Sequence, residues 1–386
     1  MLSAKQVESF IQLQQPLLTA YLNTGQAEPS RHPLVSESLV WLKKEAKWVG
    51  RDLSPAQQFL LEQQLERIRE FLNNRRPKEG ALVIFASAKT WELVPLQVAV
   101  DNELHWGRPA VSQLLWLVEE HKPYCVVVVD HKGACFFQYQ LRELVKIGEK
   151  KFDIDISEWK KKDIGHIAGQ EIQKTRGSQR DVFEHRMDAQ YAHSCTETAS
   201  QAIALSKEHN YTAIVLIGED RLSRSIEAAM PRDVRQHVIS LQKDFAGLTG
   251  RELEKRLEPI IEEWKSKHQA VIVSEFLKSN RGTVSGIEDS LFQLQNGSVW
   301  RLLLTRDLNM DLRQCLKCGW TERTVDPLCS ACGGERRTVM LRQVLPELAK
   351  LHKAEIEIVS GEAANILRKA GAMGAWLRKA KLAAVR

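Results

Sequence analysis

Residues 174–186 read KTRGSQRDVFEHR and lead into the stretch that decides how the middle of the chain folds. From Phe183 to Glu208 the sequence is rich in helix formers and contains no glycine or proline, which predicts one long α-helix. A buried strand, Ala213 to Ile217, follows this helix. A second strand, His237 to Leu241, comes after a short helix around Arg224 to Ala229. This strand–helix–strand order predicts a small parallel or mixed sheet in an α/β domain.

The same alternation of strand and helix signals extends in both directions and predicts an α/β fold with three domains. We expect these domains at 1–150, 151–247 and 248–386. The first should contain a strand at 18–23, helices at 36–48 and 54–72, and strands at 81–86, 93–100, 124–130 and 135–139. The third should contain helices at 249–267 and 270–278, a turn-rich break at 282–286, a helix at 287–295, a strand at 299–305, a helix at 341–352 and a strand at 355–359.

The composition is that of an ordinary globular protein. Of 386 residues, 43% are hydrophobic and 27% are charged, enough apolar side chains to bury sizeable cores. The first residues, MLSAKQVESF, show no basic stretch followed by a long apolar run, so we expect no signal peptide. The longest apolar runs, such as 125–129, have the length of a strand. We therefore expect a cytoplasmic protein that has no membrane partner.

Basic residues concentrate near the end of the sequence. The net charge is +6, and 368–386 contain six lysines or arginines and no acid. A solvated tail and a phosphate-contacting patch both explain this pattern. On the second interpretation, Arg378 is a candidate RNA-binding residue.

Four of the seven cysteines form two CxxC pairs with ten residues between them, Cys315, Cys318, Cys329 and Cys332. A glycine follows each pair and permits the tight turn that aims backbone N–H groups at sulfur. Four converging thiolates suit tetrahedral Zn²⁺ and leave no position open for a substrate, which predicts a structural zinc ribbon at 313–337. Disulfides or unbound thiols are the alternative. The remaining cysteines are expected in the core: Cys125, Cys135 and Cys195.

Gly177, Ser178 and Gln179 predict a glycine-led loop that projects before the long helix. Glycine allows the backbone N–H groups of a loop to approach RNA or an ester closely. The flanking basic side chains suit a phosphate-lined approach: Lys174, Arg176 and Arg180. The amide of Gln179 does not titrate, so it cannot act as a base, but it could orient a water or offer its N–H to an oxyanion. An exposed turn without chemistry is the alternative.

Three landmarks resemble the archaeo-eukaryotic release factor and Pelota family in its bacterial members. The family's Arg-Gly-Gly-Gln loop is followed by a Phe and an Arg, and here Phe183 and Arg186 stand in those places. The segment 371–378, GAMGAWLR, is similar to the family's closing Gly-Gly-Ile-Gly-Ala-(apolar)-Leu-Arg-Tyr. The third landmark is a ribbon in the last domain. Ser178 departs from the family by replacing its middle glycine, at a cost on the order of 1 kcal/mol if that position needs a positive φ.

The resemblance implies a middle α/β domain of the release-factor type. It also implies a last α/β domain of the kink-turn-binding ribosomal protein type, with the zinc ribbon inserted. It further implies that Gly177, Ser178 and Gln179 reach the peptidyl transferase centre and promote hydrolysis of peptidyl-tRNA. The implied partner is the ribosome, through its rRNA and tRNA, and a translational GTPase is left open as a second one.

The leading hypothesis is a ribosome-associated translation factor of the release or rescue type. Stop-codon reading is not expected, because the Asn-Ile-Lys-Ser decoding motif is absent from the first domain. A non-catalytic A-site binder of the hibernation-factor type is the first alternative, and Ser178 favours it. An RNA endonuclease is the second. It could draw on His166, His185 and His193 near the loop, but it lacks a convincing acid/base pair or an open metal site.

Overall fold

The computed structural model describes residues 2, 4–24, 34–74, 80–153, 175–241, 248, 250–279 and 281–378. Only the backbone of the helical residues 4, 34–37 and 175–184 belongs to this description. The chain divides into two compact units. The central unit is 122–259, and the discontinuous unit joins 2–121 to 260–386. The expected α/β class is confirmed.

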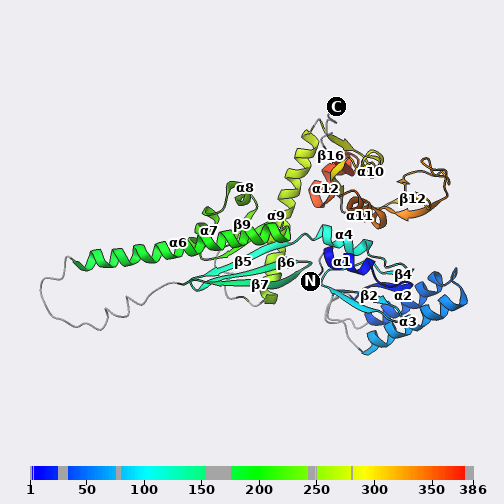
Figure 1. Cartoon of the computed structure of the whole chain (residues 1–386), viewed down its shortest axis with the longest axis horizontal. Helices are drawn as coiled ribbons and strands as arrows, with labels where there is room; N and C mark the ends of the chain where they lie inside the picture. The colour runs from blue at the N-terminus through cyan, green and yellow to red at the C-terminus, as the bar shows by residue number, and fades with distance from the viewer. Residues whose placement is uncertain are drawn as a thin grey trace, which may run out of the picture. The chain divides into compact units, whose positions relative to one another are not determined.

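The central unit is built on a five-stranded sheet in the order β7-β6-β5-β8-β9. β5, β8 and β9 run parallel to one another, whereas β6 and β7 continue the sheet as an antiparallel hairpin. The strands are β5 Tyr124–Asp130, β6 Gly133–Gln140, β7 Glu143–Lys151, β8 Ile214–Gly218 and β9 Val238–Leu241. The helices are α6 Thr175–His209, α7 Asp220–Ala228 and α8 Arg232–Arg235. Figure 1 shows the long α6 lying along this sheet.

One hydrophobic core joins α6 to the sheet. Cys125 and Val127 on β5 are fully buried and pack with Cys195, Ala199 and Ala202 of α6. The spacing of the helical residues places them on one side of the helix, as the amphipathic pattern requires. All of these helical residues lie in the second half of α6, so that half anchors the helix.

The structure divides the chain differently from the boundary expected at residue 150. β5 pairs with β8 from Cys125–Ile214 to Val129–Gly218, so the hairpin strands belong to the central sheet. The sequence pattern located β5 and β6 but not β7, and alternation along a strand does not identify a pairing partner that lies far along the chain. The expected boundary at 247 also differs, because the first ten residues of α9 (Gly250–Lys278) belong to the central unit.

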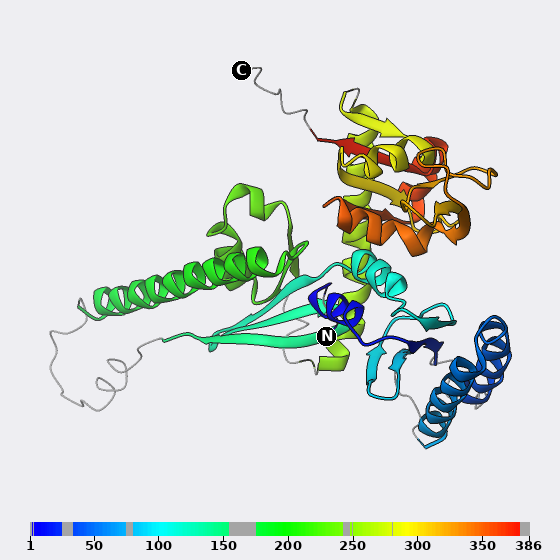
Figure 2. The same cartoon turned by 45° about the vertical axis from the view of Figure 1, so that its right-hand side comes forward.

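The N-terminal part of the discontinuous unit is an antiparallel sheet in the order β3-β2-β1-β4. The strands are β1 Leu17–Asn23, β2 Ala81–Ala86, β3 Trp91–Leu96 and β4 Glu103–Gly107. The helices are α1 Ala4–Ile11, α2 Leu34–Val49, α3 Pro55–Asn74 and α4 Ser112–Glu120. Alternate strand residues such as Leu18, Ala20 and Leu22 pack against Leu42 of α2 and Leu61 of α3. α2 and α3 therefore cover one face of the sheet (Figure 2).

The C-terminal part is a sheet in the order β10-β16-β11-β15 with helices on both faces. Leu302 and Leu304 of β11 pack in the cluster that contains α10 and α11 residues, whereas Leu303 packs with α9 and α12. The strands are β10 Thr283–Ser285, β11 Val299–Thr305, β15 Glu355–Val359 and β16 Met373–Leu377. The helices besides α9 are α10 Ile287–Gln295, α11 Leu341–Leu351 and α12 Gly361–Lys369. A small sheet, β13-β12-β14, is inserted between β11 and α11.

Helix α4 ties the two parts of the discontinuous unit together. Trp116 is 5% exposed and belongs to the hydrophobic cluster of the C-terminal part, under the guanidinium of Arg342 at 5.2 Å from the ring centroid. Glu120 is buried and pairs with Arg306 at 2.6 Å. The sequence analysis did not identify this helix, because its nine residues lie among strand signals.

Two further elements differ from the expectations. The helices expected at 249–267 and 270–278 form the single helix α9, whose buried Gln269 donates from its side chain to the carbonyl of Ile358. The turn-rich break expected at 282–286 contains the strand β10. Glycine-rich 371–378 contains β16, where Gly374 lies so close to Phe276 that a Cβ would meet its ring at 2.1 Å.

No helix in the described part of the chain is long and apolar enough to span a membrane.

Replacing Gly218 tests the close approach of β5 and β8. In Gly218→Ala, the Cβ would lie 2.2 Å from the carbonyl oxygen of Val129 and 2.6 Å from its Cγ1. We expect the free energy of unfolding of the central unit to fall by roughly 2 kcal/mol or more, because two paired strands must separate. Denaturant unfolding followed by circular dichroism measures it. The control is Gly250→Ala, where the space is open, and we expect a change within about 0.5 kcal/mol. Equal stability of the two variants would contradict this strand pairing.

Candidate metal centre and the start of helix α6

The thiols of the two CxxC pairs converge beside the inserted sheet. Its strands are β12 Asp311–Cys315, β13 Thr321–Glu322 and β14 Arg336–Met340. Their four Sγ atoms lie within 4.8 Å of one another. The Sγ separations are 3.5 Å for Cys315–Cys332, 3.7 Å for Cys318–Cys329 and 3.4 Å for Cys318–Cys332. Four thiolates at about 2.3 Å from a tetrahedral Zn²⁺ are about 3.8 Å apart. All four cysteines are free, and their arrangement is compatible with a metal site.

Two matching turns present the sulfur atoms. The backbone N–H groups of Lys317 and Cys318 lie 3.3 and 3.4 Å from Cys315 Sγ. The N–H of Gly319 donates to the carbonyl of Cys315, and that of Gly333 donates to the carbonyl of Cys329. These glycines have φ of +77° and +69°, which favours glycine at both positions. Both glycines thus adopt the tight turn expected after each pair, and N–H groups point at sulfur in the first of them.

The thiol pKa values respond to these donors and to the crowding of the four sulfurs. Hydrogen bonds from the backbone N–H groups of Cys318 and Lys317 lower the pKa of Cys315 to about 6. The backbone N–H of Trp320 lowers the pKa of Cys318, but hydrogen bonding with the neighbouring thiols raises it overall, to about 12. Four thiolates this close repel one another, so a bound divalent cation would be needed to ionise all four.

Side chains from outside the CxxC pairs hold the ribbon in place. The side-chain amide of Gln295, at the end of α10, accepts from the N–H of Thr321 and donates to its carbonyl, both at 2.7 Å. The guanidinium of Arg336 is 1% exposed and pairs with Glu322. Gly334 lies so close to the site that a Cβ would be 3.1 Å from Cys315 Sγ. The sequence analysis missed these residues. The local sequence signal that could have identified Gly334 is that it is a second glycine directly after Gly333.

The other cysteines belong largely to the core, as expected. Cys125 and Cys195 are 0% and 1% exposed, and burial raises the pKa of Cys125 to about 12. Cys135 is half-buried on β6. These three thiols are therefore structural groups.

The segment expected to form a loop at 177–179 is helical. α6 begins at Thr175, so Gly177, Ser178 and Gln179 lie in its first two turns. In an α-helix, each N–H beyond the first turn bonds to the carbonyl four residues earlier. The N–H of Gln179 is therefore paired within the helix, and the unpaired N–H groups lie before Ser178. Helix formation can continue through this glycine because one internal glycine costs only about 1 kcal/mol relative to alanine.

The start of α6 lies well beyond the anchored half of the helix. The first buried side chains among those described are Ser194 and Cys195. Twenty residues at 1.5 Å each place Thr175 about 30 Å along the axis from Cys195. Arg176 and Arg180 lie in this first part of the helix, where only the backbone is described. Lys174 lies outside the described residues.

The histidines near this segment do not form a catalytic pair in the described part of the chain. His193 lies 3.4 Å from Glu197, four residues along α6, and its side chain is 75% exposed. Glu197 also pairs with Lys150 at 2.7 Å, and this contact lowers the pKa of the Glu197 carboxyl. His185 is exposed, and His166 lies outside the described residues. An exposed ion pair on a helix face is a common surface feature.

Arg378 serves the fold of the C-terminal part. Its Nε donates to the carbonyl of Val299, and its Nη2 donates to the carbonyls of His352 and Lys353, at 2.7–3.0 Å. These contacts use most of its donors within the domain, so the structure gives no support to an RNA-binding role for this residue. The basic residues after Arg378 lie outside the described residues.

Comparison with known proteins bears on this arrangement. Residues 109–243 match the model of bacterial archaeo-eukaryotic release factor family 10. This segment is therefore similar to the bacterial archaeo-eukaryotic release factors. The segment matched by the family 10 model contains α4, the complete central sheet and α6 with Gly177, Ser178 and Gln179.

Solved structures of similar proteins include factors from archaea. The archaeal translation termination factor aRF1 is 13% identical, with 97% of both chains covered and a TM-score of 0.25. Archaeoglobus fulgidus Pelota is 11% identical over 77% of this chain and 79% of its own, with a TM-score of 0.29. A model of ribosome-bound archaeal Pelota with ABCE1 is 11% identical over 98% of this chain and 95% of its own, with a TM-score of 0.39. No curated protein matches the chain.

Proposed function

We propose that the protein is a translation factor of the release or rescue type that binds the ribosome and promotes hydrolysis of peptidyl-tRNA without reading a stop codon. The observation that carries the proposal is the match of residues 109–243 to a release factor family, because this segment contains Gly177, Ser178 and Gln179. The position of these residues at the far end of α6 supports a reaching role, since a helix end can enter a channel too narrow for a sheet.

The proposed chemistry depends on positioning. The first turn of α6 offers unpaired N–H groups and the positive end of the helix dipole, and Arg176 and Arg180 add charge. This end suits the phosphates of an rRNA-lined channel. The side chain of Gln179 would orient a water for attack on the peptidyl ester. An oxyanion role for its backbone N–H requires the first turns of the helix to unwind.

A second candidate is a non-catalytic ribosome binder of the hibernation-factor type. The helical state of 177–179 favours it, because the N–H of Gln179 is then used inside the helix. Ser178 adds to this, because serine is less costly than glycine inside a helix and so resists unwinding. An RNA endonuclease has less support, because His193 and Glu197 form an exposed pair of side chains on one helix face.

We further propose that the four-thiol site is a structural Zn²⁺ site. The supporting observations are the Sγ separations of 3.4–3.7 Å and the N–H donors aimed at Cys315. The bound ion would hold Cys315, Cys318, Cys329 and Cys332 together and supply folding free energy to the ribbon. With all four ligands supplied by protein, it would take no part in the hydrolysis.

Metal analysis tests the zinc site. Protein purified without chelator should carry one zinc per chain by inductively coupled plasma mass spectrometry. Cys315→Ser should lose the metal and lower the melting temperature of the discontinuous unit, because a ligand of the ion is gone. The matched control is Cys135→Ser, a half-buried cysteine outside the cluster, which should keep its zinc. Stoichiometric iron in place of zinc, or no metal at all, would sink the proposal.

Ribosome binding should depend on salt and on the arginines at the start of α6. Arg176→Ala/Arg180→Ala should weaken co-sedimentation with ribosomes. It should also make the slope of log affinity against log salt shallower by about one to two units. Each phosphate contact that is lost reduces the number of counterions released on binding. The control Arg232→Ala/Arg235→Ala removes the same charge from exposed positions of α8. If wild-type protein fails to pellet with ribosomes at low salt, the ribosome is not its partner.

A measurement of peptide release distinguishes the hydrolase from the non-catalytic binder. On ribosomes with peptidyl-tRNA in the P site and an empty A site, Gln179→Ala should reduce release by about tenfold with little change in binding, since the water loses its positioning group. Ser178→Gly should increase release, because glycine lowers helix stability by up to about 1 kcal/mol and frees the first turns. Gln201→Ala, on the same helix, is the control. If the wild-type protein and Ser178→Gly both bind the ribosome but release no peptide, the protein is the non-catalytic binder and not the hydrolase.

A further inference from the structure

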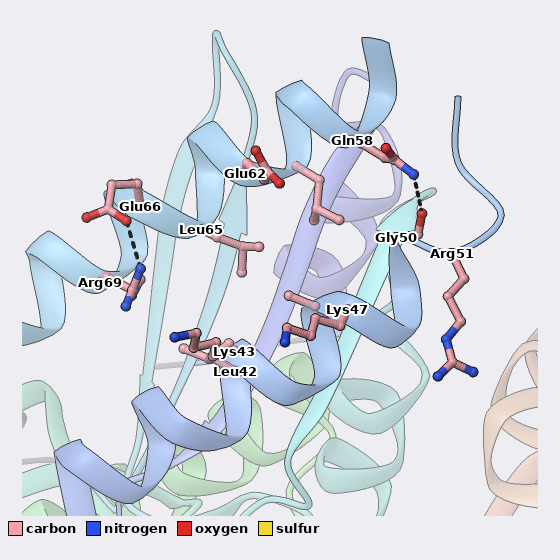
Figure 3. Close-up of a pocket in the computed structure, with 12 residues that line it drawn as sticks. Leu42, Lys43, Lys47, Gly50, Arg51, Gln58, Glu62, Leu65, Glu66 and Arg69 are labelled. Atoms are coloured by element: carbon pink, nitrogen blue, oxygen red, sulfur yellow. Dashed lines mark hydrogen bonds and ion pairs between the residues drawn. The ribbon is translucent and has the colours of Figure 1, made fainter. Parts of the chain in front are cut away.

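A groove runs between α2 and α3 of the discontinuous unit, on the side that the sheet leaves uncovered (Figure 3). It encloses about 570 Å³ and is lined by side chains of both helices. Its floor is apolar: Leu42 and Leu61 are nearly fully buried, while Ala46 and Leu65 are half-buried. The groove follows the helix axes, and the eight steps from Lys43 to Arg51, two residues beyond the end of α2, give it a length of about 12 Å.

The two sides of the groove carry opposite charges. Lys43 and Lys47 of α2, with Arg51 two residues beyond its end, form the lysine–arginine wall. Glu62 and Glu66 of α3 form the glutamate wall, which Arg69 also lines. The spacing of four residues between Lys43 and Lys47, and between Glu62 and Glu66, aligns each pair along its helix. The groove therefore presents an apolar floor between a basic rim and an acidic rim.

The charged side chains of the two walls are not paired with each other among the described residues. Among the described residues, no ion pair joins the two walls: Glu66 pairs with Arg69 of its own helix at 3.0 Å, and Arg51 stacks over Trp48. At one end of the groove the side-chain amide of Gln58 donates to the carbonyl of Gly50 at 2.9 Å, and along the two walls the floor is open, as Figure 3 shows.

Exposed apolar side chains continue the surface on both sides. Val40 precedes Lys43 by three residues and is 71% exposed, and Phe59 precedes Glu62 by three residues and is 60% exposed. Residues three apart on a helix lie on the same side, so each of these side chains flanks one wall. Large apolar side chains at this exposure, next to an apolar groove, mark an interaction surface better than isolated ones do.

We propose that this groove binds an amphipathic α-helix of a partner protein, with acidic side chains along one flank of its apolar stripe and basic side chains along the other. A helix is about 10 Å across and two to three of its turns match the length of the groove. Its apolar stripe would cover the floor, its acidic flank would face the lysine–arginine wall and its basic flank the glutamate wall. The glutamate wall disfavours RNA, because it would lie against the phosphates. The proposal is independent of the ribosome and of the residues at the start of α6.

A designed peptide tests the groove in the full-length protein. The probe is a fluorescein-labelled, capped helical peptide of about four turns with a leucine stripe, glutamates on one flank and lysines on the other. Its binding, measured by fluorescence anisotropy, should weaken by about tenfold in Lys43→Glu/Lys47→Glu, because two attractive contacts become repulsive. The same variant should bind a peptide with lysines on both flanks more tightly than wild type does. In the converse variant, Glu62→Lys/Glu66→Lys, the preference should move to a peptide with glutamates on both flanks.

The control variant is Lys5→Glu/Lys44→Glu, which makes the same charge change at exposed lysines that do not line the groove. It should bind the mixed peptide as wild type does. Circular dichroism melting checks that every variant folds, which the exposure of the changed side chains favours. Three outcomes would overturn the proposal: no binding of the mixed peptide up to about 0.2 mM, equal loss in the control variant, or displacement of the peptide by a short single-stranded RNA.

Discussion

The parallel pairing of β5 with β8 is the contact on which the central unit depends. A two-stranded hairpin is marginally stable by itself, so β6 and β7 need β5 to be fixed in a larger sheet. β5 is buried on both faces, with Cys125, Val126 and Val127 at 0% exposure, as is usual for strands inside parallel sheets. The same strand provides the surface that the second half of α6 covers. Once that half is fixed, a stiff helix carries Gly177, Ser178 and Gln179 away from the sheet, so their position is set by packing some 30 Å away.

Local patterns predicted many of the individual elements but not how they assemble. The strands β1, β2, β5, β8, β11 and β15 and the helices α2, α3, α10 and α11 lie close to the expected ranges, because period-2 and period-3.6 patterns act over a few residues. Which sheet β5 joins depends on pairing with a strand almost ninety residues away, which no local pattern records. β10 escaped prediction because its three residues pair only at one edge of a sheet. The segment 177–179 was expected to be a loop because glycine signals a turn, yet the helix formers that follow it extend the helix back through this glycine.

The two candidate sites were predictable to different degrees. The four-thiol cluster follows from spacing, since a CxxC turn brings two thiols together wherever it occurs, and the structure adds the supporting residues Gln295 and Arg336. These side chains act from outside the motif, so only a folded chain places them next to it. The segment at the start of α6 is recognised by resemblance, and its chemistry depends on which backbone N–H groups are free. That depends on whether its first turns are wound, which is a property of conformation and not of residue type.

The docking of α4 has a consequence for the order in which the protein matures during its synthesis. Trp116 belongs to the first third of the chain, but the cluster that buries it includes Ile356 and Ile358. These residues emerge about 240 residues later, which at 5–20 residues per second is roughly 10 to 50 s. During that interval the nascent chain exposes an indole and the leucines beside it, which makes α4 a natural site for chaperone capture. Helix α4 therefore completes its docking only after residues 356–358 have been synthesised.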